Sequence, residues 1–578
     1  MKKFNRILSG LGLGLMLTSI GFAGGTENAP KKEKRAQQKV EIKVTPWGPS
    51  QADVDQAKAR VERSPTMQKE LAGTKYRILG FNYLETEDKS RPTQAPTRFQ
   101  ITFYDYTNDR TLIADAGFDA GAPVSVRQAY FQPNPTDEEF EEAVRMLERD
   151  PNFAAQFKGG TLRAFRPMPP VTVLDGTTER MVNVGLEAAG GDTSQNEVVS
   201  VRIVDGEVIR YEKRAPETSR AAPDACGIPA ANQQTSSQGT AGQYQMTVTQ
   251  GATTLWNMLV IRPSASSGTA ASGIEIRDVK YKGKSVLKRG HVPVLNVEYG
   301  GGQCGPYRDW QYQEDQFDAP AAGATDPASG IRVLAAGQTA KTALDNGTDT
   351  GNFRGVAIYT QDAGYGQEVV MVTELQAGWY RYIMEWRFAP DGTIRPRYGF
   401  GATNNNCVCF VHNHHAYWRF DFDIVGSNNK VFQVERGRKF LQPILTETFR
   451  NKNLQTNRSL LIQNSAGDEA YTLVPSKTDG VADAFGAHDM WVLRYKSVAG
   501  GTAVQNEIDD GRVCCGSIQN INIDPWINNE SVLNQDVVVW YGTHFIHADG
   551  ANLLDPNRSP TVLTNSHVVG PDLRPVRW

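Results

Sequence analysis

The sequence predicts a mainly β protein in which two small α+β repeats precede one large antiparallel β-sandwich. The chain of 578 residues contains 54 glycines and 30 prolines, a composition typical of turn-rich proteins. From about residue 266 onward helical periodicity nearly disappears, and short strand-like runs alternate with Gly, Asn, Asp and Pro turns. This pattern predicts one large antiparallel β domain over residues 266–578.

An internal repeat predicts the two smaller domains. The segments DVDQAKARVERSPTMQKEL and DEEFEEAVRMLERDPNFAAQF both have the pattern of an amphipathic helix, and both contain Glu-Arg-x-Pro. Strand-like runs follow each segment, so we expect two copies of one α+β unit, over residues 49–132 and 133–214. Residues 24–48 are expected to be a polar linker. Residues 215–265, rich in Ser, Thr, Gln, Gly and Ala, are expected to be a second linker or irregular segment.

The first 23 residues have the pattern of a signal peptide. A basic start, MKKFNR, precedes a short apolar run, and Gly21–Ala23 supplies small residues at a cleavage point. The apolar run is short for a bilayer span, and no other segment is apolar enough to cross a membrane. We therefore expect an exported chain, periplasmic or extracellular, that has no membrane segment after signal cleavage.

The charge balance and the cysteines limit the partners and the covalent links. The 61 basic and 64 acidic residues give a net charge of −3 without a basic stripe, which argues against a nucleic-acid partner and favours a small molecule. Six cysteines in an exported chain can form disulfides in 15 ways, among which the sequence does not choose. Cys407 and Cys409 precede a histidine cluster, where disulfides or buried thiols are favoured over a Cu(I) or zinc site.

Three of the eight histidines head the strand-like run HNHHAYWRFDFDI. Alternate side chains of a strand share a face, so His412 and His414 project together at a spacing that one metal ion can bridge. His415 points the other way and is expected to support the site or the fold. A pair of imidazoles suits copper, zinc, iron or nickel. The next candidates for a further ligand are His544 and His547, in VVVWYGTHFIHADG.

Two of these strands resemble those of the copper amine oxidases, which oxidise primary amines with a tyrosine-derived topaquinone. The copper strand of that family reads H-x-H followed by R-x-D-x-D, and the matching residues are His412, His414, Arg419, Asp421 and Asp423. DVVVWYGTH is similar to a second family strand, so the resemblance implies copper bound by His412, His414 and His544 and not by His547. Further ordered matches, such as NFRGVAIYTQDAGYG, extend the resemblance through the β domain.

The resemblance also implies a second, calcium-type site formed by Asp421, Asp423 and Asp536. Oxygen ligands from two strands suit a hard cation, which would have a structural role. The alternative is that these carboxylates lie on a solvated strand face without an ion.

The family forms topaquinone from the first tyrosine of T-x-x-N-Y-[DE]-Y. The stretch ELQAGWYRYIMEWRFAPDGTI is similar to it, and the aligned residues are Gly378, Tyr380, Tyr382 and Trp386. Tyr380 is therefore the expected topaquinone precursor, although Trp379 replaces the family asparagine and Arg381 replaces the acid. Strand alternation turns Arg381 away from the Tyr380 ring. The alternative is that Tyr380 is only a packing residue of the sandwich.

The resemblance further implies a general base and a tyrosine that hydrogen-bonds the quinone. The family base is the Asp of F-D-x-G, which follows a Y-G turn, and the corresponding pairs here are Phe317-Asp318 and Tyr299-Gly300. Asp318 is the expected base, with a pKa raised by burial, and Tyr299 is expected to hydrogen-bond a quinone oxygen. Asp315 and Glu314 are the alternative carboxylates, which we expect to be solvated.

The implied reaction converts a primary amine and O₂ to an aldehyde, ammonia and hydrogen peroxide, in a homodimer as in the family. A second interpretation is a degenerate member that binds copper, forms no quinone and has a binding or scaffolding role. A third, an unrelated metalloenzyme without a quinone, is disfavoured by the ordered matches.

Overall fold

The computed structural model describes most of the chain after the first 38 residues. The described residues are 39–84, 93–130, 132–167, 180–189, 197–210, 227–228, 241–268, 270–299, 307–364, 366–403, 408, 412–437, 440–482, 488–496, 523–547 and 569–578. The expected signal peptide and all six cysteines lie outside them. Tyr299 ends a described strand, but its side chain is outside what the structure describes.

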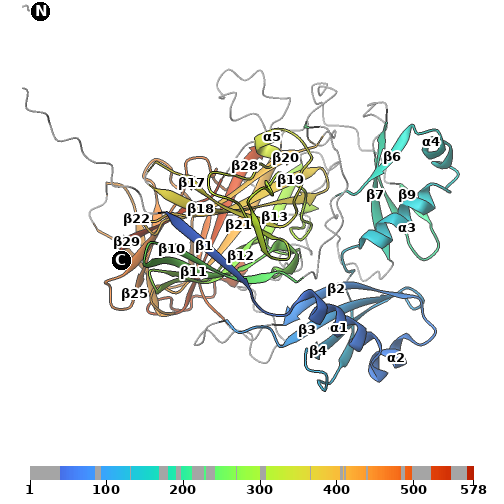
Figure 1. The fold of residues 1–578 in the computed structure, drawn as a ribbon, viewed down its shortest axis with the longest axis horizontal. Helices are drawn as coiled ribbons and strands as arrows, with labels where there is room; N and C mark the ends of the chain where they lie inside the picture. The colour runs from blue at the N-terminus through green and yellow to red at the C-terminus, as the bar shows by residue number, and fades with distance from the viewer. Residues whose placement is uncertain are drawn as a thin grey trace, which may run out of the picture. The chain divides into compact units, whose positions relative to one another are not determined.

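The two predicted repeats form two units with the same order of elements, which confirms the repeat. In the first unit α1 (Gln51–Glu62) and α2 (Pro65–Leu71) precede a sheet of β2 (Tyr76–Leu84), β3 (Arg98–Asp105), β4 (Arg110–Gly117) and β5 (Ser125–Ala129). In the second unit α3 (Asp137–Leu147) and α4 (Ala154–Lys158) precede β6 (Leu162–Phe165), β7 (Met181–Ala188), β8 (Glu197–Arg202) and β9 (Val208–Arg210). Figure 1 shows each pair of helices beside its own sheet.

Matching caps begin the first helix of each unit. The Ser50 side chain accepts from Asp53 N, and the Asp53 carboxylate accepts from Ser50 N. Thr136 and Glu139 form the same reciprocal pair at the start of α3. Such a capping box satisfies two backbone groups that have no partner within the helix. The first helix of each unit therefore begins with the same capping interaction.

The remaining strands form two large sheets. The first contains β1 (Val40–Pro46), β10 (Gln243–Gln250), β11 (Thr253–Ile261), β12 (Glu275–Tyr281), β13 (Lys284–Tyr299), β14 (Tyr307–Arg308), β21 (His412–Phe422), β24 (Thr448–Arg450), β27 (Met490–Arg494) and β28 (Val537–His547). The second contains β15 (Thr325–Ala328), β16 (Ile331–Val333), β17 (Val356–Asp362), β18 (Gln367–Ala377), β19 (Tyr380–Phe388), β20 (Ile394–Ala402), β22 (Asn429–Val434), β23 (Gln442–Ile444), β25 (Ser459–Asn464), β26 (Ala470–Val474) and β29 (Asp572–Arg577). Among these strands only β16 and β17 pair in parallel in the described ladders, so the predicted antiparallel sandwich is confirmed.

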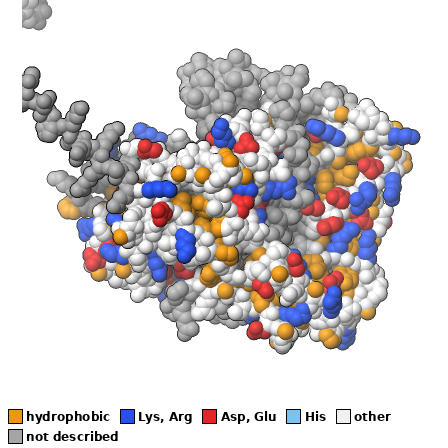
Figure 2. Space-filling model, in the orientation of Figure 1, with side chains coloured by type: hydrophobic (Ala, Val, Ile, Leu, Met, Phe, Trp, Pro, Cys, Tyr) orange, Lys and Arg blue, Asp and Glu red, His pale blue; other side chains and the backbone are white. Residues whose placement is uncertain are grey.

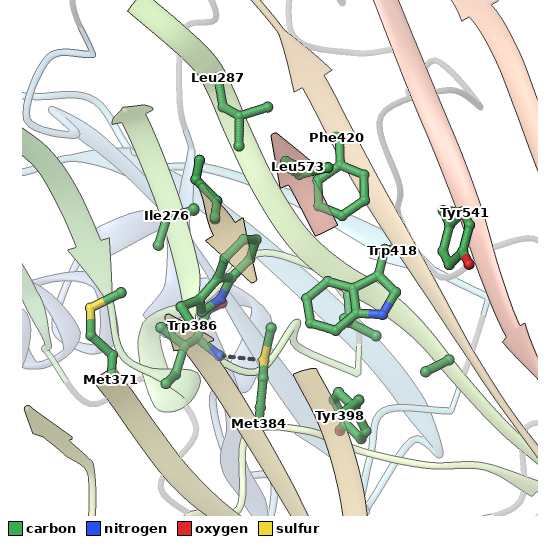
Figure 3. Packing of buried hydrophobic residues seen from close by; sticks show 14 of the residues in the cluster. Ile276, Leu287, Met371, Met384, Trp386, Tyr398, Trp418, Phe420, Tyr541 and Leu573 are labelled. Atoms are coloured by element: carbon green, nitrogen blue, oxygen red, sulfur yellow. Dashed lines mark hydrogen bonds between the residues drawn. The ribbon is translucent and has the colours of Figure 1, made fainter. Parts of the chain in front are cut away.

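A single apolar core fills the space between the two sheets. Figure 3 shows Trp386 of β19 and Trp418 of β21 packed against each other, with ring centroids 5.4 Å apart and planes at 88°. Tyr398 of β20 lies beside them, and all three side chains are fully buried. Large aromatic side chains supply much of the buried apolar area in such a core and prefer this edge-to-face geometry. The core therefore holds β19 and β21 at a defined separation.

The expected domain boundaries differ from the structure at two places. Residues 40–46, expected within a linker, form β1 and pair with β10, and residues 243–261, also expected to be irregular, form β10 and β11. In β1 the apolar side chains of Val40 and Val44 alternate with polar ones and are buried. The strongly charged sequence just before residue 40 hid this short period-two pattern.

The described surface agrees with the near-zero net charge. On the face drawn in Figure 2, basic and acidic side chains are interspersed, and no large region carries one sign. Within the described residues no helix has both the length and the apolarity needed to span a bilayer.

Candidate metal centre

Pairing between β21 and β28 determines which histidines meet. His412 lies opposite His547 in this antiparallel ladder, and His415 lies opposite His544. Directly opposite residues of such a ladder project to the same face. His412, His414 and His547 therefore share the face that points into the sandwich, with Trp418 and Phe420 of the core.

Three ring nitrogens converge on this inner face. His412 Nε2 is 3.1 Å from His414 Nε2 and 3.3 Å from His547 Nδ1. The three rings are almost fully buried. Imidazole nitrogens bind first-row metals at about 2 Å, so nitrogens separated by about 3 Å can share one ion. The donor set fits a borderline metal such as copper, and the three donors are buried.

The structure does not bring His544 to this group, which corrects the ligand set implied by the resemblance. Its Nδ1 is 2.8 Å from His415 Nδ1, and its Nε2 is 3.3 Å from Asp489 Oδ1. Both ring nitrogens are thus engaged on the outer face of the same sheet. Because His544 and His547 are three residues apart in one strand, they cannot point to the same face.

A buried polar network supports His415 and His544. Lys452 Nζ lies 3.4 Å from Asp489 Oδ1 and donates to the backbone oxygen of Gly542 at 2.6 Å. Although burial alone would raise it, the pKa of Asp489 is lowered by the hydrogen bond from His544 and by the Lys452 charge. Burial, together with His544 and Lys452, pushes the pKa of His415 well below its usual range, so this ring is neutral. The network stabilises the strands that carry the metal-facing histidines.

Tyr380 points into the histidine group from the opposite sheet. Its hydroxyl lies 2.5 Å from His412 Nε2 and 3.1 Å from His547 Nδ1. The Tyr380 ring is fully buried, and its centroid is 4.6 Å from that of His414, with the two planes nearly perpendicular. The sequence prediction that Tyr380 and the histidine pair belong to one site agrees with this geometry.

A tight turn sets the position of Tyr380. Ala377 pairs with Tyr380, so Gly378 and Trp379 form a two-residue hairpin loop between β18 and β19. Gly378 has φ 57°, a left-handed conformation that glycine adopts without steric cost. Trp379 occupies the second loop position and is buried.

Arg381 lies on the face of β19 opposite Tyr380, as strand alternation predicts. Its guanidinium pairs with Asp349 at 2.5 Å and with Asp315 at 2.7 Å, and all three side chains are buried. Nη1 also donates to the backbone oxygens of Gly378 and Tyr380, at 3.1 and 3.2 Å. Arg381 therefore ties the hairpin loop to a buried acidic cluster.

The acidic cluster contains Asp315, Asp349 and Glu374, with carboxylate oxygens within 4.8 Å of one another. Burial, opposed by Arg381 and assisted by Asp349, raises the pKa of Asp315 to about 6. Burial and the neighbouring Asp315 also raise the pKa of Glu374 well above its ordinary value. The expectation that Asp315 is solvated is therefore wrong, because backbone pairing with β18 draws this segment into the protein.

The other candidate residues lie apart from the histidine group. Glu314 is also buried rather than solvated, because it is paired with Arg262. Asp318 is half-buried and accepts from Asn346 Nδ2 at 2.8 Å, while its backbone pairs with Lys341. No contact between Asp318 and Tyr380 is seen among the described residues. The backbone of Tyr299 lies opposite His412 in the β13–β21 ladder, beside the site.

The three aspartates of the expected second site do come together. Ligand oxygens of Asp421, Asp423 and Asp536 lie within 4.8 Å of one another. Asp421 follows Arg419, whose Nη1 is 3.9 Å from Asp421 Oδ2. The grouping could hold a cation, and both the occupancy of the site and the identity of the cation stay predictions.

Comparison with solved structures identifies the fold. A copper-containing benzylamine oxidase from Hansenula polymorpha superposes with a TM-score of 0.60 over 92% of this chain and 97% of that chain, at 14% identity. An Aspergillus nidulans amine oxidase gives 0.55 over 92% and 88%, also at 14% identity. The Pichia pastoris lysyl oxidase gives 0.53 over 87% and 85%, at 12% identity. The chain has the copper amine oxidase fold.

At these identities the likeness extends to the fold alone. No protein-family model matches the sequence, and no curated protein matches it. The match nevertheless covers the small α+β units as well as the sandwich, because it includes about nine-tenths of the chain.

Proposed function

We propose that this protein is a copper-dependent amine oxidase that converts a primary amine and O₂ to an aldehyde, ammonia and hydrogen peroxide. One observation carries the proposal. His412, His414 and His547 direct three ring nitrogens at one point, and the Tyr380 hydroxyl reaches the same point from the opposite sheet. The likeness to amine oxidases in fold supports this function over other copper chemistry.

The residues of the chain prepare Tyr380 for conversion to topaquinone. His412 and His547 hold the phenol oxygen, and Phe400 packs edge-on against the Tyr380 ring at 5.4 Å. Burial excludes water and keeps the ring in one orientation, which is the main contribution that positioning makes to a reaction. When bound here, copper would supply the redox chemistry that lets O₂ oxidise the ring.

We propose Asp318 as the general base and Tyr299 as the residue that hydrogen-bonds a quinone oxygen, and both assignments rest on the family resemblance. A base must reach the substrate carbon beside the ring, and its pKa should lie near the working pH. Asp315 has a suitable pKa, but it is bound to Arg381 on the far face of β19. The proposal also includes a periplasmic or extracellular location and a homodimer, which rest on the N-terminal pattern and on the family resemblance.

A specific observation favours a second candidate function, copper binding without amine turnover. Where the family has an acid after the precursor tyrosine, Arg381 draws Asp315 into an ion pair, and Asp318 is hydrogen-bonded to Asn346. A protein without a free base beside Tyr380 would still bind copper. It would then act as a binding or scaffolding protein.

One experiment separates the two functions. Apo-protein is given Cu²⁺ and air, and the peptide that contains Tyr380 is then analysed by mass spectrometry and by quinone staining. The proposal predicts a gain of two oxygens and a loss of two hydrogens at Tyr380, and Tyr380→Phe should bind copper but remain unchanged in mass. An unmodified Tyr380 in copper-loaded protein would favour the second function.

A further inference from the structure

Tyr382 lies two residues after Tyr380 on the same face of β19, on the far side of the His414 ring. Its hydroxyl is 3.0 Å from His414 Nδ1 and donates a hydrogen bond to Asp309 Oδ2. All three side chains are fully buried. One tyrosine of the Tyr-x-Tyr pair thus meets the metal-facing nitrogens, and the other meets the opposite edge of His414.

The direction of these hydrogen bonds determines the tautomer of His414. A tyrosine has one hydroxyl hydrogen, and an ionised carboxylate only accepts. Since that hydrogen goes to Asp309, the Tyr382 oxygen accepts from His414 Nδ1, which must therefore carry a proton. The lone pair of the ring is then on Nε2, the atom that lies 3.1 Å from His412 Nε2.

Packing holds the His414 ring in this orientation from its faces. Phe400 of β20 stacks on it with centroids 4.2 Å apart and planes at 17°, and Tyr380 meets it edge-on. Asp309 is fixed in turn, because its backbone N donates to Leu295 O of β13 at 2.9 Å. The chain from Asp309 to His414 therefore connects the two sheets and leaves the ring one way to present its metal-facing nitrogen.

We propose that Asp309 and Tyr382 are positioning residues that hold His414 in the tautomer and orientation needed to bind the metal. The inference rests on the proposed copper site and extends it to two residues without direct contact with the metal. Histidine ligands generally donate their second ring N–H to an oxygen, and loss of such a partner typically lowers metal affinity by about 10–100-fold. Here the Tyr382 hydroxyl contacts both the His414 ring and the Asp309 carboxylate.

The test compares metal binding by folded apo-proteins, measured by competition with a chromogenic chelator and by the electron paramagnetic resonance spectrum of bound Cu²⁺. Tyr382→Phe should weaken Cu²⁺ binding by roughly 10–100-fold and change the copper hyperfine splitting. Tyr382→Phe also removes the hydrogen bond to the buried Asp309 carboxylate, which could itself destabilise the protein. The double variant Tyr382→Phe/Asp309→Asn controls for this effect, because it replaces that carboxylate with a neutral amide. The double variant should show the same affinity loss as the single one.

Two further variants make the result specific. Asp309→Asn keeps a carbonyl acceptor for Tyr382 and should retain most of the affinity, whereas Asp309→Leu should match Tyr382→Phe. Tyr398→Phe is the control, because this buried tyrosine of the next strand donates to Gln311 Oε1 at 3.1 Å and not to a histidine. Equal affinity and an unchanged spectrum in Tyr382→Phe would overturn the inference, whereas absence of copper binding in the parent protein would overturn the proposed function instead.

Discussion

His412 lies directly opposite His547 across the β21–β28 ladder, and Nε2 of the first is 3.3 Å from Nδ1 of the second. The pairing of these two neighbouring strands thus brings together residues that are 135 positions apart in the chain. Because the ladder has a fixed register, the same pairing sends His544 to the opposite face with His415. The copper content of histidine variants therefore tests which of the two histidines of β28 binds the metal.

His547→Ala should abolish stoichiometric copper binding while leaving the fold intact, because it removes one of three nitrogen donors. His544→Ala should lower the melting temperature, since it removes the buried ring that contacts His415 Nδ1 and Asp489 Oδ1, but the folded fraction should bind one copper per chain. Metal analysis of protein purified by gel filtration measures both. Loss of copper in His544→Ala, with normal copper in His547→Ala, would mean that the ladder is misregistered.

Removal of the Arg381 charge should strongly destabilise the protein. Arg381→Met leaves Asp315 and Asp349 buried without their cation, and breaking such a pair typically costs about 3–5 kcal/mol. Arg381→Glu should be worse, because it adds a fourth carboxyl group to the cluster. Urea unfolding measures the loss. Arg387→Met, on the same strand but partly exposed, is the control and should cost much less.

The raised pKa of Asp315 makes a stability prediction with a defined sign. Between about pH 4, near its ordinary value of 3.8, and about pH 6, the folded protein retains a proton that the unfolded chain has released. Its contribution to stability is therefore present at low pH and is lost as pH rises to about 6, by roughly 3 kcal/mol at most. Asp315→Asn imitates the protonated form, so it should gain stability relative to the parent from pH 4 to 7. A difference in stability that does not change with pH would show that Asp315 is ionised throughout.

The sequence predicted the elements that depend on local pattern. The amphipathic helices, the alternating strands and the shared face of His412 and His414 follow from side-chain periods that a strand or helix imposes. The choice between His544 and His547 did not follow. Both faces of β28 are apolar, with Val539 and Tyr541 on one and Val538 and Trp540 on the other, so alternation gives no inward direction.

Long-range charge pairing was equally hidden from the sequence. Arg381 lies on β19, whereas Asp315 and Asp349 lie in two other segments that the fold brings beside it. The local sequence around any one of these residues does not indicate the other two. Asp309 was missed for the same reason. Its importance depends on Tyr382, which lies 73 positions away on the other sheet.

Calcium should stabilise the protein through Asp421, Asp423 and Asp536 if the site has the predicted role. A bound ion relieves repulsion between the clustered carboxylates, and stabilisation should grow with the logarithm of Ca²⁺ concentration above the dissociation constant. Asp536→Asn is the best variant, because Asp536 is the most exposed of the three. Thermal unfolding with and without Ca²⁺ measures the effect, and an equal rise in melting temperature for parent and variant would place calcium elsewhere.

Asp318→Asn separates the formation of the quinone from its use. Formation needs Tyr380, copper and O₂, whereas turnover also needs a base that accepts a proton from the substrate carbon. A carboxamide cannot accept that proton, so amine oxidation should fall by about 10²–10⁴-fold while copper content and labelling of the quinone by a hydrazine are retained. Asn346→Ala is the matched control, because it removes the hydrogen bond to the carboxylate but keeps the carboxylate itself, and it should remain active. If Asp318→Asn oxidises amines at the parent rate, Asp318 is not the base, and the proposed role of this carboxylate is wrong.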